Sequence, residues 1–441
     1  MSNSTIPNRV AKTLLNALKG GVVPRTGLGY ITVGRKGEID ALLHDIETVE
    51  EGGASFRFIV GKYGAGKSFL LQAVRNFAMD KGFVVADADL SPERRLKGNS
   101  GEGLATYKEL IKNLATKTAP EGGAISLLLQ RWIAALKTEV MKEHHIQSDD
   151  ISLNSLVEVK IHQTLNEIHT IVNGFDFARV ISLYWKATLN EDDDLRNKAL
   201  NWLSGGYTTK TEAKRELGVS VIISDDDWYE YIKLLALFVV KAGYKGLLVL
   251  VDELVNIFKI SHTISRQYNY EKILTIYNDI MQGKAQHIGI IMGGTPQCIE
   301  DTKRGLFSYE ALQSRLENSR FSDADTHDLL SPIIRLKPLD PTEMYILIEK
   351  LAQIHGQVYD YIPCLNDEDY TLFIKNEYAR VGASLNITPR EIIRDFIEIL
   401  NILLQNPRKT MRSVLGDSEF VYTTSETDDE RIHEEFKGFE I

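Results

Sequence analysis

A glycine-rich segment at residues 61–68, GKYGAGKS, matches the pattern G-x-x-x-x-G-K-[ST] at every fixed position. An apolar, strand-like run precedes it, and apolar residues at helical spacing follow it. In such a strand-loop-helix unit, backbone N–H groups and the helix N-terminus surround a triphosphate. Lys67 would reach the β- and γ-phosphates, and Ser68 would ligate Mg²⁺. The alternative is a glycine-rich turn that binds nothing. The predicted nucleotide-binding residues are Gly61, Lys62, Tyr63, Gly64, Ala65, Gly66, Lys67, Ser68 and Phe69.

Two adjacent carboxylates supply what such a loop needs for hydrolysis. Residues 247–251, LLVLV, form an apolar run typical of a strand buried on both faces of a parallel sheet, and Asp252 and Glu253 follow it. Hydrolysis requires a carboxylate at the hydrated Mg²⁺ and a group that orients the attacking water. We therefore expect Asp252 at the metal together with Ser68, and Glu253 beside the water. The alternative is that both acids only cap the following helix.

A third apolar run ends in a polar side chain. Residues 287–294, HIGIIMGG, are followed by Thr295, Pro296 and Gln297. A polar residue at the tip of a strand between the two nucleotide motifs can contact the γ-phosphate or the water. Thr295 is our first candidate for this position and Gln297 is the second. The alternative is a strand end followed by a proline turn.

Arginines on two predicted helices are candidates for contact with phosphate. Thr388 reads as the N-cap of a helix, so Arg390 falls in its first turn, where a cation opposes the helix dipole unless it faces an anion. An exposed arginine is the competing interpretation. Arg315 and Arg320 lie on the amphipathic segment 311–321, and an arginine from a neighbouring subunit can stabilise the transition state of phosphoryl transfer. Salt bridges on a solvated helix are the alternative there.

The composition is that of a globular protein of about two to three domains. The chain has 441 residues, of which 43% are apolar, and a formal net charge of −10 at pH 7. This acidity argues against a surface that coats nucleic acid, although it allows a local basic groove. Cys298 and Cys364 lie far apart without metal-ligand spacing, which favours a reducing, cytoplasmic setting. Neither a signal sequence nor an apolar run of the ~18 residues needed for a membrane span is evident.

The spacing of the two nucleotide motifs predicts an insertion. Between Lys67 and Asp252 lie 185 positions, roughly twice what a compact α/β core needs, and several stretches between them show helical spacing of apolar residues. We therefore predict an α/β fold with a parallel sheet flanked by helices, a large helical insertion and a C-terminal helical lid. The predicted units are 1–103 and 244–336 for the nucleotide-binding core, 104–243 for the insertion, 337–405 for the lid and 406–441 for an acidic tail.

Two segments flank the phosphate loop in the sequence. Before it, a short strand-like run at residues 31–33 leads to Gly34, Arg35 and Glu38, which open an amphipathic helix. After it, the predicted strand at residues 83–86 ends in Asp87 and Asp89. These two aspartates are either groups near the site or, as we favour, carboxylates that end a strand.

Taken together, these segments resemble the AAA+ ATPases, especially the branch of origin-recognition and DNA-loading ATPases. The resemblance rests on VGRKGEI, GKYGAGKS, LVLVDE, SRLE, TPREIIR and the strand that ends at Thr295. It implies ATP and Mg²⁺ as cofactors and a homo-oligomer. By this resemblance Gly34, Arg35 and Glu38 would lie close to the adenine pocket, Thr295 would correspond to sensor 1, Arg390 to sensor 2 in the lid, and Arg315 to the finger arginine.

The whole chain is also similar to the BrxD family of ATP-binding proteins in BREX-type bacterial phage-defence systems. The similarity is carried by GGVVPRTGLGYITVGRKGEI, GFVVADADLSPERRL, LVDELVNIFKI and GGTPQCIEDTKRGLFSYEALQSRL. Such proteins are encoded beside helicases, so the resemblance implies defence against phage DNA. About forty residues follow Leu404, fewer than the winged-helix domain that usually follows the lid in origin-recognition ATPases. DNA contact would then use the insertion, loops that face a central channel, or a partner.

These observations lead to one main hypothesis and two alternatives. The main hypothesis is a cytoplasmic AAA+ ATPase that hydrolyses ATP with Mg²⁺ in an anti-phage complex acting on DNA. The first alternative is a nucleotide-controlled scaffold or DNA-loading switch for a partner helicase, with little turnover of its own. The second is a signalling ATPase that oligomerises when it detects a phage component. The same side chains serve all three, so the residues alone do not separate them.

Overall fold

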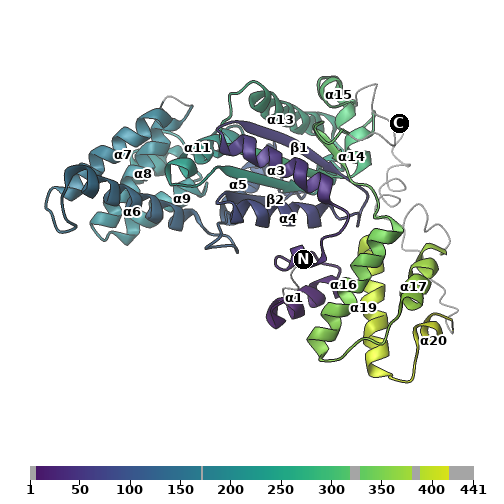
Figure 1. Ribbon diagram of the computed structural model, residues 1–441. Helices are drawn as coiled ribbons and strands as arrows, with labels where there is room; N and C mark the ends of the chain where they lie inside the picture. The colour runs from purple at the N-terminus through teal and green to yellow at the C-terminus, as the bar shows by residue number, and fades with distance from the viewer. Residues whose placement is uncertain (1–5, 170–171, 318–327, 380–387, 417–441) are drawn as a thin grey trace.

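The computed structural model describes residues 6–169, 172–317, 328–379 and 388–416 (Figure 1). Among these residues, five strands form one parallel sheet in the order β2-β3-β4-β1-β5. Because all the strands are parallel, their carboxyl ends share one edge, which is where open α/β sheets place their ligands. The predicted α/β class, with a parallel sheet flanked by helices, is confirmed. The strands are β1 Ala54–Val60, β2 Val84–Asp89, β3 Leu247–Asp252, β4 Ile288–Gly294 and β5 Ile333–Arg335.

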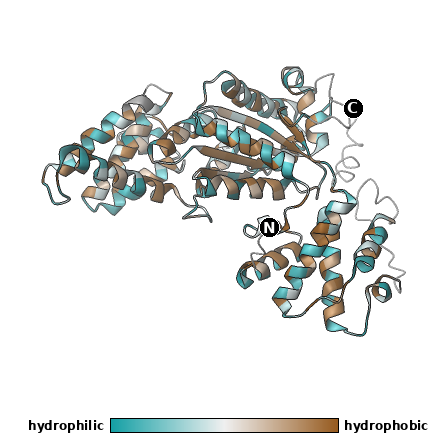
Figure 2. Ribbon diagram, viewed as in Figure 1, coloured by the Kyte–Doolittle hydropathy of each residue, from teal (hydrophilic) through white to brown (hydrophobic). Residues whose placement is uncertain are grey.

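Both faces of the sheet are buried by helices, which explains why its strands are almost continuously apolar (Figure 2). Side chains alternate between the two faces along a strand. In β3, Leu248 and Leu250 pack in a cluster with α3 Lys36–Glu50 and α4 Lys67–Asp80. Val249 and Val251 face a larger cluster on the opposite side. The helices that pack there include α5 Glu102–Lys112, α11 Trp228–Lys241 and α13 Thr263–Met281.

A helical arm extends from one end of the sheet (Figure 1). In the sequence, the arm lies between β2 and β3. It consists of α6 Ile125–His144, α7 Leu153–His169, α8 Gly174–Leu189, α9 Asp193–Leu203 and α10 Lys210–Leu217. Its buried tryptophans, Trp132, Trp185 and Trp202, belong to the same hydrophobic cluster as one face of the sheet. The boundary predicted at residue 104 falls inside α5, which packs on β2. The arm is therefore continuous with the core rather than a separately packed unit.

One buried amide holds the loop after β2 against α13. Asn269 on α13 is fully buried, and its Oδ1 accepts hydrogen bonds from the N–H groups of Leu96 and Lys97. Its Nδ2 donates to the carbonyls of Lys97 and Ser265, so the amide is fully satisfied. The indole of Trp228, at the start of α11, donates to the carbonyl of Leu96 in the same loop. The loop after β2 is thereby held by α13 and by α11.

The C-terminal helices, which we call the lid, form a separate group beside the sheet with its own hydrophobic cluster (Figure 1). It comprises α16 Pro341–Tyr359, α17 Asp367–Ala379, α19 Pro389–Gln405 and α20 Met411–Gly416. As predicted, Thr388 caps α19, and Glu391 completes a capping box with it. The tail predicted to begin at residue 406 enters this cluster through Met411, whereas residues 417–441 lie outside the described residues.

The N-terminal segment packs with the lid rather than with the sheet. The helix α1 Asn8–Lys19 contacts α16 and α19, and Leu14, Leu15 and Leu18 are buried in the lid cluster. This differs from the predicted division, in which residues 1–103 belong to the core. The strand-like run predicted at residues 31–33 is not a strand, because Ile31 ends the short helix α2 Leu28–Ile31 and is buried in the same cluster.

The remaining elements lie between β3 and β5. They are α12 Val255–Phe258, α14 Pro296–Glu300, the 3₁₀ turn η1 Leu306–Ser308 and α15 Glu310–Leu316. The helix α12 begins two residues after Glu253, and α14 begins directly after Thr295. Both helices therefore begin at the edge of the sheet where the strands end.

Candidate nucleotide-binding site

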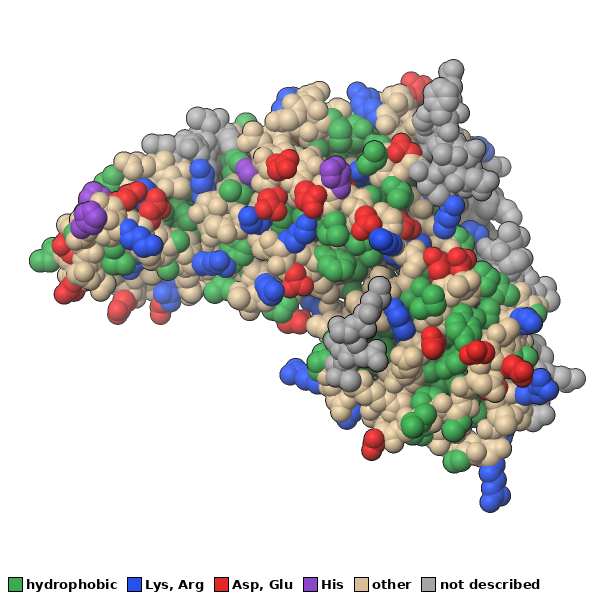
Figure 3. All heavy atoms as spheres, in the orientation of Figure 1, with side chains coloured by type: hydrophobic (Ala, Val, Ile, Leu, Met, Phe, Trp, Pro, Cys, Tyr) green, Lys and Arg blue, Asp and Glu red, His purple; other side chains and the backbone are tan. Residues whose placement is uncertain are grey.

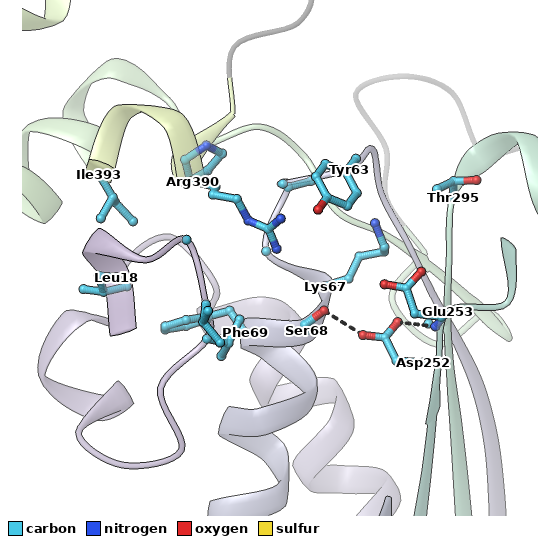
Figure 4. A pocket seen from close by; sticks show the side chains of 18 of the residues that line it. Leu18, Tyr63, Lys67, Ser68, Phe69, Asp252, Glu253, Thr295, Arg390 and Ile393 are labelled. Carbon is cyan, nitrogen blue, oxygen red and sulfur yellow. Dashed lines mark hydrogen bonds between the residues drawn. The ribbon is translucent and has the colours of Figure 1, made fainter. Parts of the chain in front are cut away.

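A cavity of about 210 Å³ opens where the phosphate loop, the ends of β3 and β4, the N-terminal segment and the lid meet (Figure 4). Its polar end contains Lys67, Ser68, Asp252 and Glu253. Its opposite wall is apolar and comes from two parts of the chain. Leu18, Val22, Val23, Pro24, Ile31 and Val33 precede the phosphate loop, and Leu339, Leu347, Pro389 and Ile393 belong to the lid.

The loop between β1 and α4 adopts a conformation that requires glycine at two positions. Gly64 and Gly66 have φ values of +76° and +94°, in the left-handed region. A Cβ atom at Gly64 would also lie 2.7 Å from Thr388 Oγ1, so the lid approaches the bare backbone of the loop. The Lys67 ammonium donates to the carbonyls of Gly61 (2.8 Å) and Lys62 (3.0 Å). The loop thus holds this cation where a triphosphate would meet it.

A hydroxyl and a carboxylate meet beside the loop. Ser68 Oγ donates to Asp252 Oδ2 at 2.6 Å, and the other oxygen of Asp252 accepts from the N–H of Glu253 at 2.8 Å (Figure 4). Both side chains offer the hard oxygen ligands that Mg²⁺ prefers. The neighbouring strand leaves room for this carboxylate because it has Gly293 there, where a Cβ would lie 2.3 Å from Asp252 Oδ1. The donor set therefore fits Mg²⁺.

Glu253 has a strained backbone at the centre of the site. Its φ is +62°, a left-handed conformation that costs a non-glycine residue free energy and that clusters at functional sites. Its carboxylate faces the Lys67 ammonium in the cavity (Figure 4). Burial and the charge of Asp252 raise the pKa of Glu253, while Lys67 opposes this shift. The strained turn directs the carboxylate into the cavity.

Arg35 braces the phosphate loop from its lid side. The buried guanidinium donates to Glu38 Oε1 and to the carbonyl of Ala65, each at 3.1 Å, and it lines the cavity. Gly34, with φ +68°, lies against the lid, because a Cβ there would meet the carboxyl group of Glu343 at 2.5 Å. The structure thus brings Arg35 to the site and places Gly34 against α16.

Thr295 lies at the cavity, but its hydroxyl is engaged elsewhere. Its Oγ1 accepts from the N–H of Cys298 (3.4 Å) as the N-cap of α14 and is turned away from Lys67 and Glu253 (Figure 4). Among the described residues, the cavity lining includes Thr295 and not Gln297. In this conformation, Thr295 follows the last residue of β4 and caps α14.

The three predicted arginines have different positions. Arg390 lines the cavity, with its Cζ 4.6 Å from the ring centroid of Tyr63. Arg315 is exposed on α15, where it donates to the carbonyl of Ala311 and to Asn278 Oδ1, and it is not one of the described residues that line this cavity. Arg320 lies outside the described residues. The structure therefore brings Arg390 to this site and not Arg315.

Comparison with known proteins identifies the family. Residues 6–419 match the model of the family described as BREX system ATP-binding protein BrxC/D. The chain belongs to this BrxC/D family. The description covers BrxC and BrxD together and does not distinguish between them. A comparison with curated proteins gives no match. Of the helices that the structure describes in this BrxC/D chain, none combines the length and the apolar character of a bilayer span.

Sequence reasoning missed much of the wall of this BrxC/D pocket. Asn256 and Lys259, three and six positions after Glu253, line the cavity, and the charge of Lys259 opposes the rise in the pKa of Glu253 that burial and Asp252 cause. Their spacing from Glu253 in DELVNIFK is a signal that could have found them. The N-terminal segment around Val22 carries no comparable signal, because its place beside the lid depends on long-range packing.

The aspartates that end β2 take two roles. Asp87 accepts from the buried Arg75 at 2.9 Å. Asp89 lies opposite Asp252 in the register of β2 and β3, and burial together with the charge of Asp252 raises its pKa. Neither is one of the described residues that line the cavity. The acidic residues at this edge of the sheet therefore include Asp89, next to the site, as well as Asp252.

Proposed function

We propose that this member of the BrxC/D family binds ATP with Mg²⁺ and hydrolyses it as part of a BREX-type defence complex that acts on DNA. The observation that carries the proposal is the 2.6 Å hydrogen bond between Ser68 Oγ and Asp252 Oδ2, with the Glu253 carboxylate beside it in the same cavity. A phosphate loop, a hard-oxygen pair and a second carboxylate are the parts that nucleotide hydrolysis requires. The family description of an ATP-binding protein supports the choice of nucleotide.

Each side chain then has a role in the proposed reaction. Backbone N–H groups of residues 61–68 and the N-terminus of α4 bind the phosphates, with Lys67 at the β- and γ-positions. Ser68 and Asp252 would hold Mg²⁺, which neutralises charge on the phosphates when it is bound. Glu253 orients the attacking water and accepts its proton. The apolar wall receives the adenine, with Arg35 and Gly34 holding the phosphate loop against the lid.

Three further assignments belong to the proposal. Arg390 contacts the γ-phosphate from the lid, which its place in the cavity supports. Thr295 turns its hydroxyl toward the γ-phosphate when nucleotide is bound. Arg315 acts as a finger in the site of a neighbouring subunit, which its exposure on α15 supports and which requires a homo-oligomer. We also propose the BrxD type within the family, a cytoplasmic location and a helicase among the partner proteins.

The surface does not favour the basic segment SPERRLK, residues 91–97, as a DNA contact. In the segment SPERRLK, Arg95 lies 3.8 Å from Glu102 and Lys97 pairs with Asp226. Arg94 donates to the carbonyl of Asp89. Acidic and basic side chains are also interspersed over the face shown in Figure 3. Binding of the phosphate backbone depends on Lys and Arg side chains that neutralise its charge, and these three cations of the segment are already held by a carboxylate or a carbonyl. We therefore place DNA contact in the assembled complex rather than in this segment.

The deciding experiment measures steady-state ATP hydrolysis with and without duplex or single-stranded DNA. Glu253→Gln is expected to lower turnover by about 100-fold or more, because it removes the base while it keeps the shape of the side chain. Glu271→Gln, the same change on the exposed surface of α13, is the matched control and should leave turnover unchanged. ATP binding, measured by calorimetry, should persist in Glu253→Gln.

The outcomes separate the hypotheses. Turnover that rises with DNA and disappears in Glu253→Gln supports a DNA-coupled ATPase. Tight ATP binding with little turnover under every condition favours the nucleotide-controlled scaffold for a partner helicase. Turnover that requires a phage component instead of DNA favours the signalling ATPase. Absence of ATP binding in the unmodified protein contradicts all three.

A further inference from the structure

The phosphate loop and the lid touch through an aromatic ring and a guanidinium. The Cζ atom of Arg390, in the first turn of α19, lies 4.6 Å from the ring centroid of Tyr63, in the middle of the phosphate loop (Figure 4). A cation at this distance over an aromatic face is attracted by the ring. Tyr63 is 43% exposed, so packing in the hydrophobic core does not account for an aromatic side chain at this position.

Two close approaches surround this contact. Thr388, two residues before Arg390, lies so near Gly64 that a Cβ there would be 2.7 Å from its hydroxyl. On the N-terminal segment, a Cβ at Gly21 would lie 3.9 Å from the Cδ of Arg390. The stem of Arg390 is thus bounded by the N-terminal segment and its head by the phosphate loop. These contacts restrict the directions in which the guanidinium can point.

The Arg390 guanidinium over the Tyr63 ring keeps its hydrogen-bond donors available. A guanidinium stacks on a ring with its flat face, while its N–H groups point outward in its plane. In the part of the chain that the structure describes, no carboxylate or carbonyl accepts a hydrogen bond from Arg390, and the residue lines the nucleotide cavity. The contact with the Tyr63 ring therefore holds the cation in place without using the donors that an anionic ligand would need.

We infer that Tyr63 is a positioning residue that holds Arg390, and with it the first turn of α19, at the phosphate loop before nucleotide binds. The inference rests on the proposed ATP site for its ligand, the γ-phosphate. Holding the side chain in place beforehand lowers the entropy cost of ordering it when ATP binds. Tyr63 thus acts through Arg390 and need not touch the nucleotide.

A double-mutant cycle tests this role. ATP and ADP dissociation constants are measured by calorimetry for Tyr63→Leu, Tyr63→Phe, Arg390→Ala and Tyr63→Leu/Arg390→Ala. Tyr63→Leu is expected to weaken ATP binding by about two- to fivefold and ADP binding less, because only ATP carries the γ-phosphate. Tyr63→Phe keeps the aromatic face and should restore most of this loss. In the Arg390→Ala background, Tyr63→Leu should have no further effect. An equal loss in both backgrounds would overturn the inference.

A second measurement needs no nucleotide. Hydrogen exchange of the backbone amides at residues 390–396 should be several-fold faster in Tyr63→Leu than in the unmodified protein, and close to the unmodified rate in Tyr63→Phe. Tyr268→Leu, which removes a similarly exposed ring on α13, is the matched control and should leave these amides unchanged. Unchanged exchange in Tyr63→Leu contradicts the inference even if ATP binds. Faster exchange in a protein that binds no ATP contradicts the proposed function and leaves the positioning role standing.

Discussion

Ser68 and Asp252 are 184 positions apart in the sequence and are joined by a 2.6 Å hydrogen bond at the carboxyl edge of the sheet. The hydroxyl belongs to the first turn of α4, which follows β1, and the carboxylate belongs to the end of β3. In the sheet, β4 lies between β3 and β1. Both groups are brought together by the parallel arrangement, because every strand ends on the same side. The contact therefore depends on the sheet and not on either motif alone.

This pair predicts how metal affects the protein. With ATP present, excess Mg²⁺ should raise the thermal unfolding midpoint further, since each tenfold gain in affinity adds about 1.4 kcal/mol of stabilisation. In Asp252→Asn the additional effect of Mg²⁺ should be lost while an effect of ATP alone remains. Asp149→Asn, on an exposed loop of the arm, should behave like the unmodified protein. A full Mg²⁺ effect in Asp252→Asn would contradict the assignment of the metal ligands.

Gly64 offers a test of the approach between the loop and the lid. Gly64→Ala introduces a Cβ at φ +76° and 2.7 Å from Thr388 Oγ1, whereas Gly283→Ala introduces one at φ +70° with open space around it. The left-handed backbone alone costs about 1–2 kcal/mol, so both changes should destabilise their segments. Only Gly64→Ala should also weaken ATP binding and speed hydrogen exchange at the start of α19. Equal effects of the two changes on α19 would contradict the close approach.

The parts of the site that the sequence predicted are those carried by short local patterns. The residues GKYGAGKS lie between an apolar, strand-like run and a helical pattern, which predicts a strand-loop-helix unit. The residues LVLVDE contain the end of a continuous apolar run, which predicts a buried strand. The capping box of α19 is similarly local, because Thr388 and Glu391 are three residues apart. The parallel sheet followed from apolar runs that only burial on both faces explains.

The parts that were missed depend on contacts between distant segments. Ile31 lies in an apolar run that reads as a strand, yet it ends a helix because its partners are the lid residues of its cluster. Leu18 and Ile393 face the same cavity from opposite ends of the chain, and neither position has a pattern that announces the other. The contact between Arg390 and the Tyr63 ring likewise joins distant segments. Tertiary packing, which local propensity does not encode, decided these positions.

Asn269 should be important for holding the loop after β2 against α13. Asn269→Ala leaves the N–H groups of Leu96 and Lys97 without their acceptor in a buried site, at a cost of about 1–3 kcal/mol for each unsatisfied group. Trypsin should then cleave after Lys97 faster than in the unmodified protein. Asn278→Ala removes a less buried amide from the same helix and serves as the control. Equal cleavage rates in the two variants would show that the loop is held by other contacts.

His355 predicts how the stability of the lid depends on pH. The imidazole is fully buried, with Nδ1 2.8 Å from the hydroxyl of Tyr361 and Nε2 3.3 Å from Asn401 Oδ1. Burial lowers its pKa below 6.5, so the folded lid binds this proton less readily than the unfolded chain does. The lid should therefore keep its full stability above pH 6.5 and lose stability as the pH falls from 6.5 toward the lowered pKa.

The measurement for His355 is hydrogen exchange of α16 and α19 between pH 7.5 and 5, corrected for the intrinsic pH dependence of exchange. His355→Gln removes the titrating group while it keeps a hydrogen-bonding side chain, so its corrected stability should vary less across this range. The neighbouring Tyr361 does not titrate there, since burial raises its pKa to about 12. Identical pH profiles for His355→Gln and the unmodified protein would therefore assign the acid sensitivity of the lid to another group.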